Sequence, residues 1–95
     1  MIEILTFRLR EGADPEAYKA LDERLQTEFF YQQPGLERRT TARSPDGTYV
    51  SITHWDSVDA ADTAVAKTFD ANEFTEPLTA LILPSTMESR RYDTL

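Results

Sequence analysis

The chain contains no cysteine, a single histidine and few basic residues, and each shortage excludes a class of protein. Without cysteine there is no disulfide, no thiolate nucleophile and no thiolate-bound metal, and one histidine is too few for a zinc site. Ten Lys and Arg against seventeen Asp and Glu give a net charge of −7, which argues against binding to nucleic acid or to an anionic membrane surface. Glu3 and Arg8 interrupt the N-terminal apolar run, so neither a signal peptide nor a spanning helix is predicted. We expect a cytoplasmic protein with no metal, nucleic-acid or membrane partner.

The 95 residues suit one domain, residues 1–95, with a shallow core. The alternation in Met1–Arg10 predicts a strand with Leu5, Phe7 and Leu9 on one face and Ile2, Ile4 and Thr6 on the other. Asp14 before Pro15 is typical of a helix start. Four apolar residues then recur at helical spacing, and Pro34-Gly35 ends that helix; they are Tyr18, Leu21, Leu25 and Phe29.

A β-hairpin is predicted from Leu36 to Asp56, with the turn at Ser44–Gly47. If those four residues form the whole loop, counting outward places Arg38 opposite Thr53 and Glu37 opposite His54. A bulge would shift this pairing by one residue.

The C-terminal part predicts a helix capped by Ser57, whose pattern breaks near Asp70–Glu76 with a break or kink before Pro77. A short last helix ended by Pro84 and a final strand over Thr86–Asp93 follow. The buried stripe of the first of these helices is expected to comprise Val58, Ala61, Val65 and Phe69.

The resulting order, β-α-β-β-α-β, predicts an α+β, ferredoxin-like fold: a four-stranded antiparallel sheet with strands one and three in the middle and the helices on one face. Apolar residues on the other face, Ile2, Ile4, Val50 and Ile52, would be bare in a monomer. Exposing such a patch favours association, so we expect a homodimer through the open sheet face.

The residues that end the third strand, Trp55-Asp56-Ser57, precede a helix. Together with Pro34-Gly35 and the hairpin, they resemble the antibiotic-biosynthesis-monooxygenase-like family of dimeric α+β barrel proteins. The resemblance covers essentially the whole chain in element order, but its specific part is the tryptophan followed by an acidic residue and serine. It implies a cavity beside Trp55, between sheet and helices.

Members of that family include cofactor-independent monooxygenases of quinol-type substrates, haem-degrading enzymes and proteins of no known activity. The haem-degrading branch uses a histidine on the second helix and an asparagine on the first strand. The corresponding helical region here is residues 63–67, TAVAK, and the first strand holds no asparagine. Haem degradation is therefore set aside, and no cofactor is expected.

Strand alternation groups Trp55 with Tyr49, Ser51 and Thr53 on the helix side, where they are the candidates for binding a small aromatic ligand. The alternative for Trp55 and Tyr49 is simple core packing. Arg38, placed on the same face by the predicted pairing, is a candidate for holding an anionic or phenolate oxygen. The favoured alternative is that an arginine on this edge strand reaches past the rim to solvent.

His54 is the one side chain whose unperturbed pKa suits a base near neutral pH. Because neighbouring strand residues point to opposite faces, His54 should not share a cavity with Trp55. We expect it at the dimer interface or rim, with a catalytic role only if a bulge reverses its face.

Three functions are compatible with these residues. The first is a small cofactor-independent monooxygenase acting on an electron-rich, quinol-type aromatic substrate. The second is a non-catalytic ligand-binding or regulatory dimer, favoured by the lack of a base on the Trp55 face. The third is an isomerase or lyase on the same scaffold, since one fold hosts several chemistries.

Overall fold

A computed structural model describes all residues, 1–95. Its elements in chain order are β1 (Ile2–Leu9), α1 (Pro15–Arg24), a π-helical turn η1 (Leu25–Phe29), a 3₁₀ turn η2 (Phe30–Gln32), β2 (Leu36–Arg43), β3 (Tyr49–Trp55), α2 (Val58–Asp70), α3 (Asn72–Leu81) and β4 (Ile82–Tyr92). The predicted order of strands and helices is confirmed. No helix is long and apolar enough to cross a membrane.

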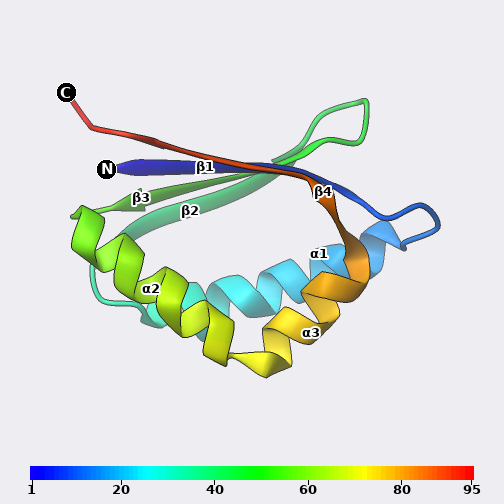
Figure 1. Cartoon of the computed structure of the whole chain (residues 1–95), viewed down its shortest axis with the longest axis horizontal. Coiled ribbons are helices and arrows are strands. Elements are labelled where there is room, and N and C mark those ends of the chain that lie inside the picture. Colours follow the sequence, from blue (N-terminus) through cyan, green and yellow to red (C-terminus); the bar gives the residue numbers. More distant parts are fainter.

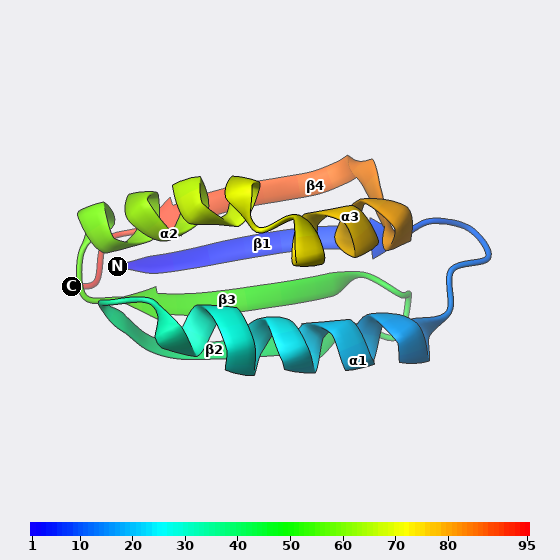
Figure 2. The same cartoon turned by 90° about the horizontal axis from the view of Figure 1, so that it is seen from below.

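The four strands form one antiparallel sheet in the order β2-β3-β1-β4, so β1 and β3 are central as predicted. All helices lie on one face of this sheet (Figure 1). Seen from the helix side, α1 runs along β2 and β3, while α2 and α3 follow β1 and β4 (Figure 2). The ferredoxin-like α+β fold is thus confirmed, and the opposite sheet face carries no layer of its own.

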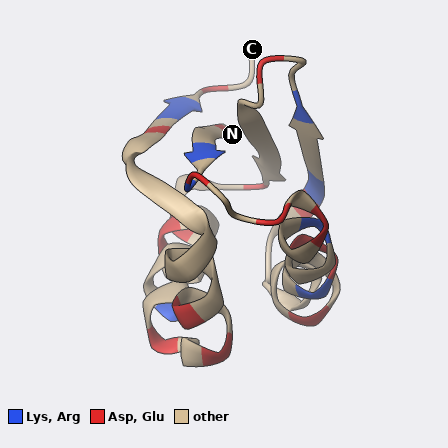
Figure 3. Ribbon diagram, turned by 90° about the vertical axis from the view of Figure 1, so that its right-hand side faces the viewer, with Lys and Arg blue, Asp and Glu red and all other residues tan.

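Charge is divided between these layers. Acidic residues recur along the helices, whereas basic residues mark several of the strands (Figure 3). The surface above the helix layer is therefore mainly negative, and an uncharged ligand approaches it more readily than an anion does.

The first helical segment begins as its sequence predicts. The Asp14 side chain accepts a hydrogen bond from the Glu16 amide, and Pro15 occupies the first helical position. The four predicted core residues, Tyr18, Leu21, Leu25 and Phe29, are all buried. The π-helical turn η1 inserts extra chain into this helix, a feature that is common at functional sites. Phe29 lies in the core cluster with Leu21, Leu25 and Phe74, and Phe30 packs against that cluster and against the cluster of Trp55.

The C-terminal part follows the prediction only in part. The helix breaks at Ala71, within the predicted stretch Asp70–Glu76, but the predicted strand start at Thr86 is wrong and Pro77 lies inside α3. A proline there removes one backbone hydrogen bond, which the burial of Phe74 at 2% exposure offsets. The last strand begins at Ile82, and Pro84 lies within it. A proline is tolerated there because β4 is an edge strand.

The predicted buried stripe of α2 is also wrong in part. Ala61 is buried as expected, but its partner is Ala64. Val58, Val65 and Phe69 are 46%, 38% and 76% exposed. The two alanines pack against Trp55, because only small side chains let the helix axis approach an indole this closely.

The hairpin register differs from the predicted one by a residue. The Ser44 amide donates to the Thr48 carbonyl, so Thr48 belongs to the loop and the first strand pair is Arg43 with Tyr49. A bulge between Leu36 and Arg38 then restores the predicted pairing of Leu36 with Trp55. Between these two points each residue of β2 is paired with the β3 residue that follows its predicted partner. Arg39 instead of Arg38 is therefore paired with Thr53.

Candidate functional site

A cavity of about 350 Å³ lies between the sheet and the helix layer. Its walls are predominantly apolar and come from β1, α1, η1, η2, α2, α3 and β4, with Leu5, Phe7, Leu25, Leu78 and Ile82 among them. The size and the apolar lining are those of small-molecule sites. The exposed ring of Phe69 lies at its edge.

The floor of the cavity is polar at β3. Ser51 and Thr53 point to the helix side as predicted, are 6% and 4% exposed, and line the cavity. Tyr49 lies on the same face but outside the cavity. Its ring stacks on Phe7 with the centroids 5.5 Å apart, and Arg43 Nη1 donates to its hydroxyl. Packing therefore accounts for Tyr49.

Trp55 does not line this cavity, which corrects the expectation of a cavity beside it. The indole is 1% exposed and packs between Ala61 and Ala64. Phe30, whose ring centroid is 6.5 Å from that of Trp55, lines the cavity instead. Trp55 thus supports the cavity from behind Phe30.

The arginine of the cavity is Arg39, whereas the sequence predicted Arg38. Arg39 is opposite Thr53 and is 6% exposed, while Arg38 is opposite His54 and is exposed. The physical reason is the five-residue loop with its compensating bulge at Glu37. Ser44 and Asp46 hydrogen-bond the backbone of Thr48 and so hold it in the turn. These turn-forming residues are the sequence signal that shifts the register by one and identifies Arg39.

Arg39 is held by three groups of the first helical segment. Its Nη2 donates to Asp22 Oδ1 at 2.8 Å, its Nη1 donates to Gln26 Oε1 at 3.3 Å, and its Cζ lies 4.6 Å from the centre of the Phe30 ring. The charge of a buried guanidinium requires such a partner. The π-helical turn matters here because it precedes Phe30 directly.

Tyr18 and Thr41 complete the environment of Asp22, since both hydroxyls donate to the same Oδ1 at 3.3 and 3.2 Å. Burial, reinforced by the negative charge of Asp22, raises the pKa of Tyr18 far above its ordinary value. Tyr18 therefore stays protonated at neutral pH and acts as a hydrogen-bond donor, so it is unsuited to be a base.

His54 lies on the opposite face of the sheet, beside Ile2 of β1 and Arg38 of β2. This is the face that strand alternation predicted for it. The sheet separates His54 from the cavity, and the bulge at Glu37 leaves its direction unchanged. Of the two catalytic candidates, Arg38 and His54, the structure brings neither to the cavity.

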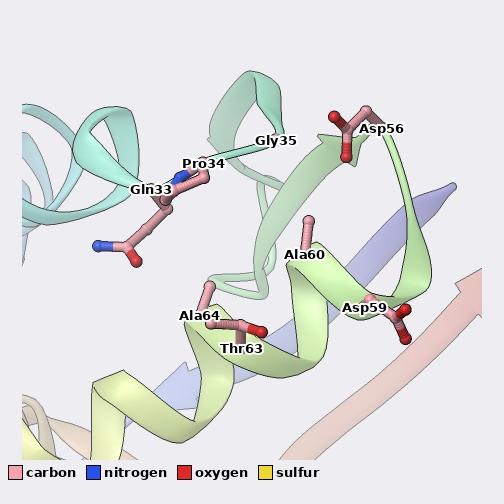
Figure 4. A pocket seen from close by; sticks show the side chains of 8 residues that line it. All are labelled: Gln33, Pro34, Gly35, Asp56, Asp59, Ala60, Thr63 and Ala64. Atoms are coloured by element: carbon pink, nitrogen blue, oxygen red, sulfur yellow. The ribbon is translucent and has the colours of Figure 1, made fainter.

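A second, more polar hollow of about 230 Å³ lies between the end of β3 and the start of α2. Its side chains do not converge (Figure 4): Gln33 and Asp59 point away from one another, and Asp56 stands apart at the rim. No group of three or more metal-ligating side chains occurs in the structure. The cavity with Ser51 and Thr53 is therefore the better candidate site.

The known proteins that this chain is similar to were found among solved structures. No family model matches the chain, and no curated protein sequence matches it. SnoaB, a cofactor-independent oxygenase from Streptomyces nogalater, is 27% identical over 99% of this chain and 94% of its own, with a TM-score of 0.67. A protein from Bordetella bronchiseptica, provisionally named an antibiotic biosynthesis monooxygenase, is 15% identical over 99% and 96% of the two chains, with a TM-score of 0.78.

A nipsnap family protein of unknown function from Agrobacterium tumefaciens is 23% identical over 94% of this chain and 82% of its own, with a TM-score of 0.65. The fold is therefore shared by proteins with and without an assigned activity. The resemblance predicted from the sequence is confirmed by the oxygenase and monooxygenase neighbours.

Proposed function

Since the chain is antibiotic-biosynthesis-monooxygenase-like in fold, we propose that it is a cofactor-independent oxygenase of an electron-rich, quinol-type aromatic substrate. The observation that carries the proposal is the apolar cavity of about 350 Å³ with the buried cation Arg39 at its edge. A cavity of this kind binds an aromatic body. The charge of Arg39 is paired with Asp22, but its Nε has no hydrogen-bond partner in the chain and is a donor for an anionic oxygen formed there.

The proposed reaction needs no group beyond substrate, oxygen, protein and solvent water. An activated ring methylene loses a proton, which water at the mouth of the cavity carries to solvent because the lining holds no free base. The electron-rich anion adds O₂ to give a peroxide, which takes a proton back as water leaves. Two C–H bonds break, one oxygen atom becomes the new carbonyl, and the other leaves as water: R₂CH₂ + O₂ → R₂C=O + H₂O. The protein contributes by excluding water and by stabilising the anion.

Each residue has a separate part in this proposal. The apolar walls hold the ring system, and Ser51 and Thr53 bind its oxygen substituents. Arg39, beside Thr53 on the neighbouring strand, offers its unpaired Nε as a further donor. Trp55 keeps Phe30 in place. Glu3 is the carboxylate in the lining, and it is held by Arg91 Nε at 2.8 Å.

Oxygen uptake by the purified protein with anthrone tests the proposal. We expect protein-dependent consumption above the spontaneous rate. Leu78→Trp, which fills the cavity, should abolish this rate, and Val58→Trp, on an exposed position of α2, should leave it unchanged. Equal rates with and without protein for anthrone and for a naphthoquinol would refute it.

A non-catalytic ligand-binding dimer is the second candidate function. It is favoured by the absence of a free base in the lining, where Tyr18 is kept protonated and Glu3 is paired with Arg91. It predicts that aromatic ligands bind with Leu78-dependent affinity and that oxygen is not consumed.

Homodimerisation through the open sheet face belongs to the same proposal. Ile2, Ile4, Val50 and Ile52 are only half-buried in the single chain, and their burial would be favourable by about 25 cal/mol per Å². Ile52→Glu should convert a dimer to a monomer in sedimentation-equilibrium measurements, while Val58→Glu, at an exposed position of α2, tests whether any added charge has this effect. A monomeric wild-type protein would overturn this point.

A further inference from the structure

The polar floor of the cavity consists of two free hydroxyls. The side chains of Ser51 and Thr53 are buried from bulk solvent at 6% and 4% residue exposure. Neither side chain hydrogen-bonds another group of the chain, and both residues belong to the cavity lining. Their oxygens are not among the fully buried unpaired atoms, which are Gln33 Oε1, Arg39 Nε and Trp55 Nε1, so the two hydroxyls are reached from the cavity. A hydroxyl that faces a cavity and has no partner within the chain is free to donate a hydrogen bond to a ligand and to accept one from it.

The other hydroxyls of the cavity are already engaged. Thr68 donates to the Ala64 carbonyl, Thr75 to that of Ala71, and Thr79 to that of Thr75. Such bonds to the preceding helical turn satisfy the donor within the helix. The helix side of the cavity thus offers few free donors, and hydroxyl recognition is concentrated on β3.

The spacing of the two free hydroxyls is set by the strand. Ser51 and Thr53 are two residues apart on the same face, which separates their side chains by about 6.6 Å. The strand partners of Thr53 are Glu3, paired with Arg91, and Arg39, paired with Asp22. The charges around the hydroxyls are therefore balanced, and the hydroxyls themselves are neutral.

We propose that Ser51 and Thr53 form a two-point clamp for a planar ring that carries oxygen atoms at para positions, the arrangement of a 1,4-quinol or 1,4-quinone. The separation across such a ring suits two hydroxyls that rotate toward it. The apolar walls above, including Leu5 and Leu78, cover the faces and edges of the ring. This inference rests on the proposed function. The clamp orients the quinone product with its oxygen-to-oxygen axis along β3, and it holds the methylene substrate through that substrate's single oxygen.

A hydroxyl both donates and accepts hydrogen bonds. Each member of the clamp can therefore accept from a quinol O–H or donate to a quinone carbonyl. The clamp holds both redox forms in one orientation, which a purely donating group such as a lysine does not.

The test uses isothermal titration calorimetry with two probes, 1,4-naphthoquinone and 1-tetralone, which has one carbonyl. The chain has no cysteine, so thiol addition does not consume the quinone. One net hydrogen bond contributes about 1 kcal/mol, or about fivefold in affinity. Ser51→Ala and Thr53→Val should each weaken naphthoquinone binding about fivefold, and together about 25-fold.

For 1-tetralone the double variant should lose only about fivefold, because one carbonyl engages one hydroxyl. The matched control is Thr75→Val, which removes a hydroxyl of the same cavity that is already bonded to Ala71. It should change naphthoquinone affinity less than twofold. Circular dichroism melts verify that each variant is folded.

Naphthoquinone binding that is unchanged in Ser51→Ala and Thr53→Val, or weakened equally by Thr75→Val, would overturn the clamp. Equal losses for both probes would also overturn two-point recognition. Failure of the oxygenase proposal looks different: the binding losses appear as expected, but no oxygen is consumed. Oxygen uptake that is indifferent to Ser51 and Thr53 would leave the oxygenase standing without the clamp.

Discussion

The buried pair of Arg39 and Asp22 gives the sharpest test of the structure, because the sequence predicted Arg38 in that place. The two side chains are 4% and 13% exposed and their charged atoms are 2.8 Å apart. Arg39→Met keeps much of the volume but leaves the Asp22 carboxylate buried without its cation. Removing one partner of a buried ion pair costs about 3–5 kcal/mol.

The remaining donors to Asp22, the hydroxyls of Tyr18 and Thr41, place the expected cost at the lower end, about 3 kcal/mol. In urea unfolding with an m-value of about 1–2 kcal/mol/M, the midpoint should fall by roughly 2 M. The double variant Arg39→Met/Asp22→Leu should recover most of the loss, since it removes both charges.

Arg38→Met is the matched control, one residue away on the exposed face. It should change the free energy of unfolding by about 0.5 kcal/mol or less. If Arg38→Met proved as destabilising as Arg39→Met, or if Arg39→Met were neutral, the observed hairpin register and its buried pair would be refuted.

Three further predictions concern local structure. Gly35 has φ +86°, and a Cβ there would lie 2.5 Å from Asp56 Oδ1, whereas a Cβ at Gly12, with φ +80°, meets no atom within 4 Å. Gly35→Ala should therefore destabilise the fold more than Gly12→Ala, which costs only about 1–2 kcal/mol of backbone strain. Equal losses in thermal melts would contradict the close approach at Gly35. A hydrogen bond from Ser44 lowers the pKa of Asp46 from 3.8 to about 2. The ionised carboxylate therefore stabilises the fold above pH 3.8, and this contribution is lost as the pH falls through about 2. Wild type and Asp46→Asn should differ in stability at neutral pH and converge in acid, and a difference that is constant with pH would contradict this. Phe69→Ser should change stability by about 0.5 kcal/mol or less, because Phe69 is 76% exposed; a loss of several kcal/mol would restore the buried stripe predicted from the sequence.

Most of the fold followed from signals that act over a few residues. Alternation identified the faces of β1 and β3, the helix cap at Asp14 marked the start of α1, and the spacing of Tyr18 to Phe29 gave its buried side. These patterns arise from the geometry of single elements, which sequence alone records.

The errors lie where tertiary packing decides. The inclusion of Thr48 in the turn and the bulge at Glu37 depend on how two strands meet, and a shift of one residue exchanges Arg38 for Arg39. Likewise, α2 buries Ala61 and Ala64 because Trp55 occupies the space beneath it. The helical spacing of the larger residues Val58, Val65 and Phe69 does not reveal that Trp55 lies under the other side of α2.

The candidate site was predictable only in part. The alternation of side chains along β3 predicted that Ser51 and Thr53 share the helix-facing side, where they form the cavity floor, and that His54 lies on the opposite side. The position of Trp55 outside the lining was not predictable, since it depends on Phe30, which the π-helical turn brings between indole and cavity. Local irregularities of this kind have no clear sequence signature.

The most direct test of the proposed oxygenase is oxygen-isotope labelling with anthrone under ¹⁸O₂, using protein prepared free of flavin and metal. The account predicts anthraquinone with one ¹⁸O atom and one labelled water per turnover, formed at a protein-dependent rate that Leu78→Trp abolishes. Product whose label is absent, or whose rate of formation is the same without the protein, would contradict it.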